Sequence, residues 1–422
     1  MLYEQWRAVA SARANELALV DRSAGRRWTF AHLARLSETA PASAGTWMQP
    51  RGAGGDFVLD VLAGWREGQV VCPLETGRAL EGVKAELPKG IVHVKHTSAT
   101  TGPARAILFT AAQLARDAAN IVQTMGLESS MPNLGVISLA HSYGFSNLVL
   151  PLLLHGIPLY LGRTPMPERM RQMMTEQDRW TLPAVPALWR TWMEAGILEE
   201  RVALAISAGA PLPSMLEREV FARHGLKIHN FYGASECGGI AYDDSDQPRA
   251  EDSRIGRPLQ GVRVAEGSNG CLHIHSAAVG TGYWPEEDAA ILGAGRYVTH
   301  DMGTVEHGWV HWRGRAGDLI NVAGRKVNPE SLEAILGNGP GIEDCLVFGV
   351  ERPGSRRGEE IVICYVSASE HTEHRCRQWA VERLPAWQVP RYWWKVVALG
   401  SNQRGKRSRK EWRERFLRDR TS

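Results

Sequence analysis

Between about residues 130 and 235, short apolar runs rich in β-forming residues alternate with segments that have a helical pattern. This alternation constrains the fold more strongly than any other feature of the chain. It favours a mostly parallel sheet covered by helices, and such sheets bind ligands at the carboxyl ends of their strands. The expected strands are 134–138, 156–162, 181–185, 202–207 and 226–232, and the expected helices are 167–177 and 213–225.

The pattern changes twice after this region. From about residue 250, turn glycines separate short alternating strands, which predicts a small β subdomain. After Arg315, the segment Asn328-Pro329-Glu330 predicts the start of a helix, because it combines a capping residue, a proline at the first position and an acid near the positive end of the helix dipole. Further strands are expected at 342–350, 359–366 and 392–399.

These patterns together predict an α/β protein with two domains. We expect a large N-terminal domain, residues 1–315, with parallel helix-covered sheets and the small β subdomain. An α+β domain, residues 316–422, is expected to follow it. The 422 residues are 44% hydrophobic and 23% charged, as in ordinary globular proteins.

Charge and cysteine placement exclude several classes of protein. The net charge of +3 does not by itself indicate a nucleic-acid partner, although residues 404–422 hold nine basic and three acidic residues. The six cysteines are scattered without a C-x-x-C pair, which argues against a structural zinc site and a disulfide framework. Glu4 and Arg7 stand where a signal peptide needs an apolar core, and the most apolar stretch, 145–161, is broken by prolines. We therefore expect a cytoplasmic protein without a membrane span.

A loop of small hydroxylated residues follows the apolar run 90–94. Such residues, ending in glycine, suit a loop that wraps phosphate with backbone N–H and side-chain O–H groups. It is no Walker A loop, because no Gly-Lys-Ser/Thr follows, and clusters of this kind are more often simple turns. The loop consists of Thr97, Ser98, Ala99, Thr100, Thr101 and Gly102.

Further motifs stand downstream in a fixed order. They are Asn230-Phe231-Tyr232-Gly233-Ala234-Ser235-Glu236, Thr299-His300-Asp301, the segments 314–320 and 324–330, and Gly405-Lys406. This ordered series resembles the adenylate-forming superfamily of acyl- and aryl-CoA synthetases, adenylation domains and luciferases. The resemblance covers nearly the whole chain, with an N-terminal region that is shorter than usual for the family.

The resemblance implies a role for each matching residue. ATP would be bound by the loop at Thr97, Ser98, Thr100, Thr101 and Gly102, and by Gly209, Ala210, Pro211, Tyr232, Gly233, Ser235, Asp301 and Arg315. Glu236 would hold Mg²⁺, and Asp301 would bind the ribose hydroxyls. Asp318 would be the hinge between the domains. Lys406 would bridge the substrate carboxylate and the α-phosphate, where it neutralises charge that develops in the transition state.

The segment 139–145 resembles the part of the family that borders the acyl pocket, so His141 is a candidate residue of the acid-binding site. No aspartate stands between His141 and Leu154 to pair with a substrate ammonium, which disfavours amino acids. The expected activity is therefore ATP-dependent activation of an aryl or acyl carboxylic acid. The acyl group would pass to coenzyme A or to an acyl carrier protein.

One alternative stays open. Departures near the phosphate loop, among them Ala99 in place of a usual glycine and Arg105 in place of a usual lysine, are also compatible with a catalytically weak relative. Arginine at position 105 keeps the positive charge but presents a planar fork where lysine presents a compact ammonium. A catalytically weak relative would bind nucleotide or a partner as a scaffold.

Overall fold

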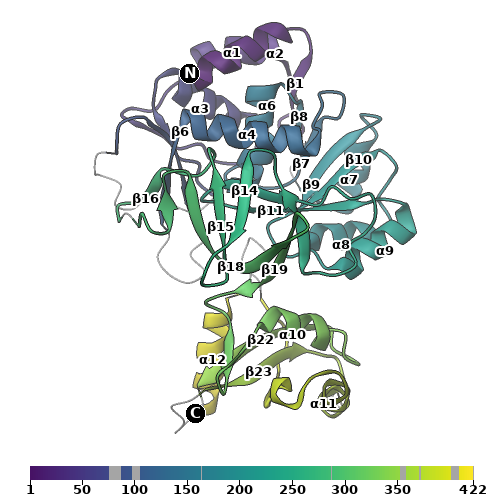
Figure 1. Ribbon diagram of the computed structural model, residues 1–422. Helices are drawn as coiled ribbons and strands as arrows, with labels where there is room; N and C mark the ends of the chain where they lie inside the picture. The colour runs from purple at the N-terminus through teal and green to yellow at the C-terminus, as the bar shows by residue number, and fades with distance from the viewer. Residues whose placement is uncertain are drawn as a thin grey trace.

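A computed structural model describes residues 1–75, 87–96, 105–162, 164–286, 288–351, 358–369, 372–400 and 408–421. In Figure 1, the large N-terminal part forms the upper body and a smaller part that follows β19 lies below it. The mixed α/β architecture predicted from the sequence is confirmed. No helix within these residues is long and apolar enough to cross a membrane.

The largest sheet contains the predicted parallel region. Its parallel pairs are β1 with β8, β8 with β7, β7 with β9, β9 with β10, and β10 with β11. The strands are β1 (Leu17–Asp21), β7 (Asn133–Gly135), β8 (Leu159–Leu161), β9 (Trp180–Ala184), β10 (Val202–Ser207) and β11 (Ile228–Ala234), with β2 (Arg26–Thr29) antiparallel at the edge. Each strand expected between residues 130 and 235 is therefore present, although β7 and β8 are shorter than expected.

The same sheet continues through an antiparallel region. β12 pairs with β11 on one side and with β13 on the other, so the expected small β subdomain extends the large sheet instead of forming a separate one. The antiparallel strands are β12 (Gly238–Tyr242), β13 (Arg254–Pro258), β14 (Val262–Glu266), β15 (Cys271–Ser276), β17 (Leu292–Gly293), β18 (Arg296–Glu306) and β19 (Trp309–Arg315).

A second sheet lies beside the first and leads to the expected phosphate loop. Its order is β16 (Gly282–Trp284), β6 (Ala106–Thr110), β5 (Ile91–His96), β4 (Val70–Val71) and β3 (Trp47–Met48). Helix α4 (Ala111–Met125) follows β6. It begins with a capping box between Thr110 and Gln113 and is ended by Gly126 at φ 61°.

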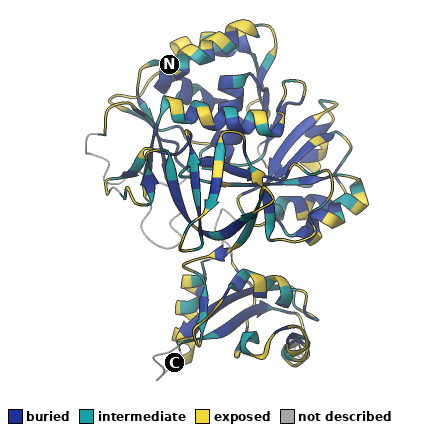
Figure 2. Cartoon of the chain, in the orientation of Figure 1, coloured by how far each residue is buried: buried dark blue, intermediate teal, exposed yellow. Residues whose placement is uncertain are grey.

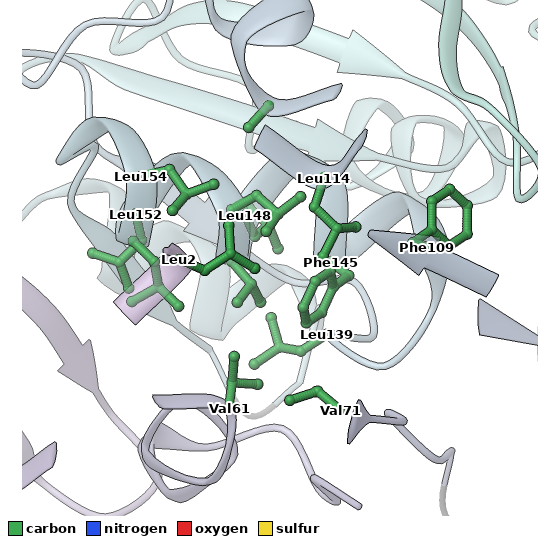
Figure 3. Close-up of a cluster of buried hydrophobic side chains, with 14 of the residues drawn as sticks. Leu2, Val61, Val71, Phe109, Leu114, Leu139, Phe145, Leu148, Leu152 and Leu154 are labelled. Atoms are coloured by element: carbon green, nitrogen blue, oxygen red, sulfur yellow. The ribbon is translucent and has the colours of Figure 1, made fainter. Parts of the chain in front are cut away.

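The remaining helices of the large part cover the two sheets. They are α1 (Leu2–Ala12), α2 (Phe30–Thr39), α3 (Gly55–Arg66), α5 (Ser142–Gly144), the π-helix η1 (Phe145–Val149), α6 (Leu150–His155), α7 (Pro167–Met174), α8 (Pro186–Glu194) and α9 (Ser214–His224). Figure 2 shows mostly buried strands and exposed residues on the outer sides of the helices. Figure 3 shows one apolar cluster that joins Leu2 and Val61 to Phe109, Leu114 and Phe145, so the N-terminal helices share a core with α4 and η1.

The smaller part is an α+β unit, as the sequence predicts. A hairpin of β20 (Ile320–Val322) and β21 (Arg325–Val327) precedes α10 (Pro329–Leu336), which Asn328 caps by accepting a hydrogen bond from the Glu330 N–H. The strands β22 (Asp344–Glu351), β23 (Glu359–Val366) and β24 (Tyr392–Lys395) form a sheet, packed with α11 (Thr372–Arg383), the 3-10 turn η2 (Ala386–Gln388) and α12 (Arg409–Thr421).

All six cysteine side chains of the chain are buried. Burial raises the pKa of Cys72 to about 12 and places that of Cys237 well above its ordinary value. Since the thiolate is the reactive form of cysteine, these two thiols are expected to be unreactive as nucleophiles.

Candidate active site

Asp301 is the centre of a hydrogen-bonded group at the end of the antiparallel region. The register of β18 against β19 places Asp301 opposite Arg315, whose Nε donates to Asp301 Oδ1 at 3.0 Å. Tyr232 Oη, at the end of β11, donates to Oδ2 at 2.6 Å, and Trp312 Nε1 donates to Oδ1 at 3.3 Å. The carboxylate is thus held in one orientation by three donors while its residue remains only 8% exposed.

The charges of this group fix its protonation. Burial, reinforced by the neighbouring Asp301 carboxylate, raises the pKa of Tyr232 well above its ordinary value, so its hydroxyl keeps the proton that it donates. Burial lowers the pKa of Arg315, but the charge of Asp301 more than offsets this and the net pKa of Arg315 is raised. A neutral tyrosine, a guanidinium and a carboxylate therefore meet at this point, with Asp301 as acceptor.

Glu236 lies in the turn that follows β11. Its Oε1 accepts a hydrogen bond from Tyr283 Oη at 3.2 Å, and its backbone oxygen accepts one from the Gly280 N–H at 2.8 Å. Burial raises the pKa of Glu236, while its own backbone N–H, Tyr283, His300 and Arg315 act in the opposite direction. A cation bound against this carboxylate would stabilise its charged form.

The residues present fit a magnesium ion that a nucleotide brings with it. Mg²⁺ is usually held by one or two carboxylates together with substrate phosphates and water, without a dedicated protein cage. Within the described ranges no three or more His, Cys, Asp or Glu side chains converge on a metal position. The half-buried carboxylate of Glu236 therefore suits shared coordination with phosphates.

The expected adenine-binding segment follows the carboxyl end of β10. Gly209 stands there with φ 84°, a left-handed conformation that glycine adopts without strain, and is followed by Ala210 and Pro211. Since β10 and β11 are parallel neighbours, this segment and the Tyr232–Glu236 segment leave the same edge of the sheet. This is the edge at which such sheets bind ligands.

His141 borders the site from a different direction. It precedes α5, where its Nδ1 accepts a hydrogen bond from the Tyr143 N–H at 3.2 Å, and the next residue, Ser142, donates from Oγ to Ser235 Oγ at 2.9 Å. Residues 140–142, together with 73–75 and His96, line a small open pocket. The structure therefore places the proposed acyl-pocket residue one position from a contact with the Ser235–Glu236 segment.

Several predicted residues lie outside the described part of the chain. These are Thr97, Ser98, Thr100, Thr101 and Gly102 of the phosphate loop, and Lys406. Thr97 directly follows β5, and Lys406 stands three positions before Arg409, the first residue of α12.

Two residues of the site were not predicted from the sequence, Tyr283 and Trp312, which donate to the carboxylates of Glu236 and Asp301. Arg105, noted from the sequence in place of a usual lysine, has its guanidinium 5.1 Å from the centre of the Tyr283 ring. Trp312 stands three residues before Arg315, a spacing that would place the two side chains on opposite faces of a regular strand, and the register of β18 against β19 shifts between Met302 and Gly303. The sequence therefore held no local signal for Trp312. Tyr283 had none, since β16 reaches Glu236 only through its pairing with β6 in the second sheet.

The family model for AMP-binding enzymes matches residues 61–284, which is more than half of the chain. The chain belongs to the AMP-binding enzyme family. The model for the C-terminal domain of AMP-binding enzymes matches residues 331–406 as well. The recognition of this family from the ordered motifs is thereby confirmed, as is the expectation of an enzyme.

Curated relatives of this AMP-binding enzyme are CoA ligases. A feruloyl-CoA synthase from Amycolatopsis is 28% identical over 357 residues, which cover 78% of this chain and 72% of that protein. A 2-succinylbenzoate–CoA ligase from Staphylococcus aureus is 24% identical, with coverage of 76% and 66%.

Solved structures share the fold of this AMP-binding enzyme. ATP-bound MatB from Rhodopseudomonas palustris superposes with a TM-score of 0.86 over 99% of both chains at 19% identity. The o-succinylbenzoate CoA synthetase of Bacillus subtilis, in complex with its acyl-adenylate, gives 0.80 over 97% of both chains at 17% identity. The predicted fold class is thus also found in solved adenylate-forming enzymes.

Proposed function

We propose that this enzyme activates a carboxylic acid with ATP, releases pyrophosphate and transfers the acyl group to a phosphopantetheine thiol. The observation that carries the proposal is the fixed Asp301 carboxylate, held by Tyr232, Trp312 and Arg315. Tyr232 stands four residues before Glu236. A carboxylate with lone pairs held in place can accept hydrogen bonds from two neighbouring hydroxyls, such as those of a ribose.

The chain's own groups supply what the reaction needs. A carboxylate that attacks a phosphate must overcome the repulsion between two anions. Mg²⁺ held by Glu236, together with the ammonium of Lys406, would neutralise charge that develops at the phosphates. The ring of Tyr232 would offer a face to the adenine, while its hydroxyl keeps Asp301 in place.

The acid is proposed to be an aryl or acyl acid and not an amino acid. Two curated relatives are named for aromatic acids, feruloyl and 2-succinylbenzoate, and this supports an aryl substrate. The absence of an aspartate between His141 and Leu154 argues in the same direction, because a substrate ammonium would be left unpaired.

The acceptor thiol is proposed to be that of coenzyme A or of an acyl carrier protein. The names of the relatives favour coenzyme A. The basic stretch 404–422 would attract either the phosphates of the coenzyme or an acidic carrier protein. Single-turnover transfer from preformed acyl-adenylate distinguishes them. Faster transfer to free coenzyme A than to any carrier protein of the same cell excludes the carrier protein as the preferred acceptor.

We further propose that residues 1–315 and 316–422 act as two domains that rotate about Asp318 between the two half-reactions. Asp318→Pro would fix φ near −65° and should trap one orientation. Adenylation and thiol transfer should then change unequally. Equal rates of both half-reactions in the variant and the wild type would exclude rotation at this residue.

Carboxylate-dependent exchange between ATP and pyrophosphate tests the function itself. A panel should include hydroxycinnamic and succinylbenzoic acids, malonate, straight-chain acids and amino acids. We expect exchange with at least one aryl or acyl acid, dependent on Mg²⁺ and lost in Asp301→Ala. Binding of ATP without exchange for any acid would instead favour the scaffold alternative.

A further inference from the structure

A buried ion pair joins β5 to α4 and contacts the turn that follows Glu236. Lys95 Nζ, on β5, is 3.7 Å from Asp117 Oδ2, on α4, and both side chains are 3% exposed. Ser146 Oγ donates to Asp117 Oδ2 at 2.6 Å and accepts from Lys95 Nζ at 3.3 Å. A buried ion pair is weak evidence for stability, since well-packed apolar residues often serve as well. Its presence calls for another explanation.

The three residues come from segments that lead into the candidate site. Lys95 stands two positions before Thr97, where the expected phosphate loop begins. Ser146 is in η1, four residues after Ser142, which bonds to Ser235. A π-helix is rare and occurs frequently at functional sites. Asp117 is the residue at which these two segments meet.

The second oxygen of Asp117 reaches the turn that carries Glu236. Oδ1 accepts a hydrogen bond from the Gly239 N–H at 3.1 Å. The adjacent Gly238 has φ 72°, and a Cβ built on it would come within 1.9 Å of the same oxygen. Asp117 therefore packs directly against the backbone of the turn, in contact that leaves no room for a side chain.

The strand pairing alone leaves this turn loosely specified. The register of β11 against β12 shifts between Tyr232 and Gly233, and such irregularities next to active sites redirect side chains. The Asp117 carboxylate supplies an independent fixed point three residues after Glu236. The Gly280 N–H separately donates to the backbone oxygen of Glu236.

We propose that Asp117 is a positioning residue for the metal carboxylate. It would fix the Glu236–Gly239 turn from behind, while Lys95 and Ser146 hold its own carboxylate in place. The inference rests on the proposed function in so far as Glu236 holds Mg²⁺ with ATP. It assigns no contact between Asp117 and the nucleotide.

Matched variants separate positioning from stability. Both variants of Asp117 are made in a background that carries Lys95→Met and Ser146→Ala. Replacing Asp117 there does not leave the buried Lys95 ammonium or the Ser146 hydroxyl without its partner. In this background, Asp117→Asn keeps an oxygen for the Gly239 N–H, whereas Asp117→Leu removes it at similar size. Asp117→Ala serves if the leucine variant does not fold.

Two measurements decide the outcome. We expect the leucine variant to exchange the amides of residues 236–240 about tenfold faster than the asparagine variant, with unchanged exchange in β9. We also measure how much Mg²⁺ increases the affinity for a non-hydrolysable ATP analogue. This increase should be about tenfold smaller in the leucine variant than in the asparagine variant. Equal exchange at 236–240 in the two variants would overturn the inference. Failure of the wild type to bind the analogue would overturn the proposed function, and amide exchange would still decide the role of Asp117.

Discussion

Arg409 donates a hydrogen bond from Nη1 to Asp318 Oδ2 at 3.2 Å, which ties the first turn of α12 to the segment after β19. The same guanidinium donates to Glu330 and, through Nη2, to both oxygens of Glu333, while Nε donates to the Val347 carbonyl. The Arg409 side chain therefore binds three carboxylates. It does so where Asp318, the predicted hinge, meets α12, the helix that follows Lys406.

Replacing Arg409 should destabilise the smaller part of the protein. Arg409→Ala leaves three partly buried acids close together without their cation, and we expect a loss of about 2 kcal/mol in the free energy of unfolding. Chemical denaturation measures it. The adjacent Lys410→Ala is the control, because Lys410 is exposed. A similar loss in both variants would contradict a specific role of the Arg409 cluster.

The free energy of unfolding should depend on pH through the titration of Glu333. Burial raises its pKa from 4.5 to about 7, against the lowering effect of the Arg409 guanidinium. Because the folded state holds the proton more tightly than the unfolded state, this contribution to stability is fully present below pH 4.5 and is lost as pH rises through about 7. Glu333→Gln should flatten the decline in unfolding free energy over this window. An unchanged slope would show that other groups cause it.

Removing the Tyr232 hydroxyl should weaken nucleotide binding, while the ring that we propose to face the adenine stays in place. Tyr232→Phe deletes the 2.6 Å hydrogen bond to Asp301. The loss of one hydrogen bond to a charged group predicts an increase of about tenfold in the Kd for ATP. Tyr242→Phe, on the neighbouring strand β12, controls for the loss of a buried hydroxyl. Equal ATP binding in all three proteins would rule out this role for Tyr232.

Lys406 is predicted to act in adenylation alone. Lys406→Ala should lower the rate of acyl-adenylate formation by about 10²–10³, as expected when one electrostatic contact to a transition state is removed. Transfer from preformed acyl-adenylate to the thiol should be affected much less. Near-normal pyrophosphate exchange in the variant would refute the assignment.

The sequence predicted those parts of the fold that depend on local patterns. β9, β10, β11, α9 and the capped start of α10 follow from apolar periodicity and from turn and cap residues close in the chain. The extension of the large sheet through β12 and β13 was not predicted, because strand pairing between distant segments leaves no local pattern.

The candidate site shows the same division. Tyr232, Glu236, Asp301 and Arg315 were recognised as motif residues, and the structure joins three of them directly through hydrogen bonds. Tyr283 and Asp117 were not recognised, since their contacts with the site arise only when β5, β6, β16 and α4 pack together.

The burial of the cysteines has a consequence for an enzyme of the proposed activity. An activated acyl group reacts with any accessible thiolate, and Cys237 directly follows the carboxylate of Glu236. All six thiols lie in the interior, and burial keeps Cys237 in its protonated form. In an enzyme of the proposed activity, this burial would protect the protein against self-acylation and keep the activated acid for the thiol of the incoming acceptor.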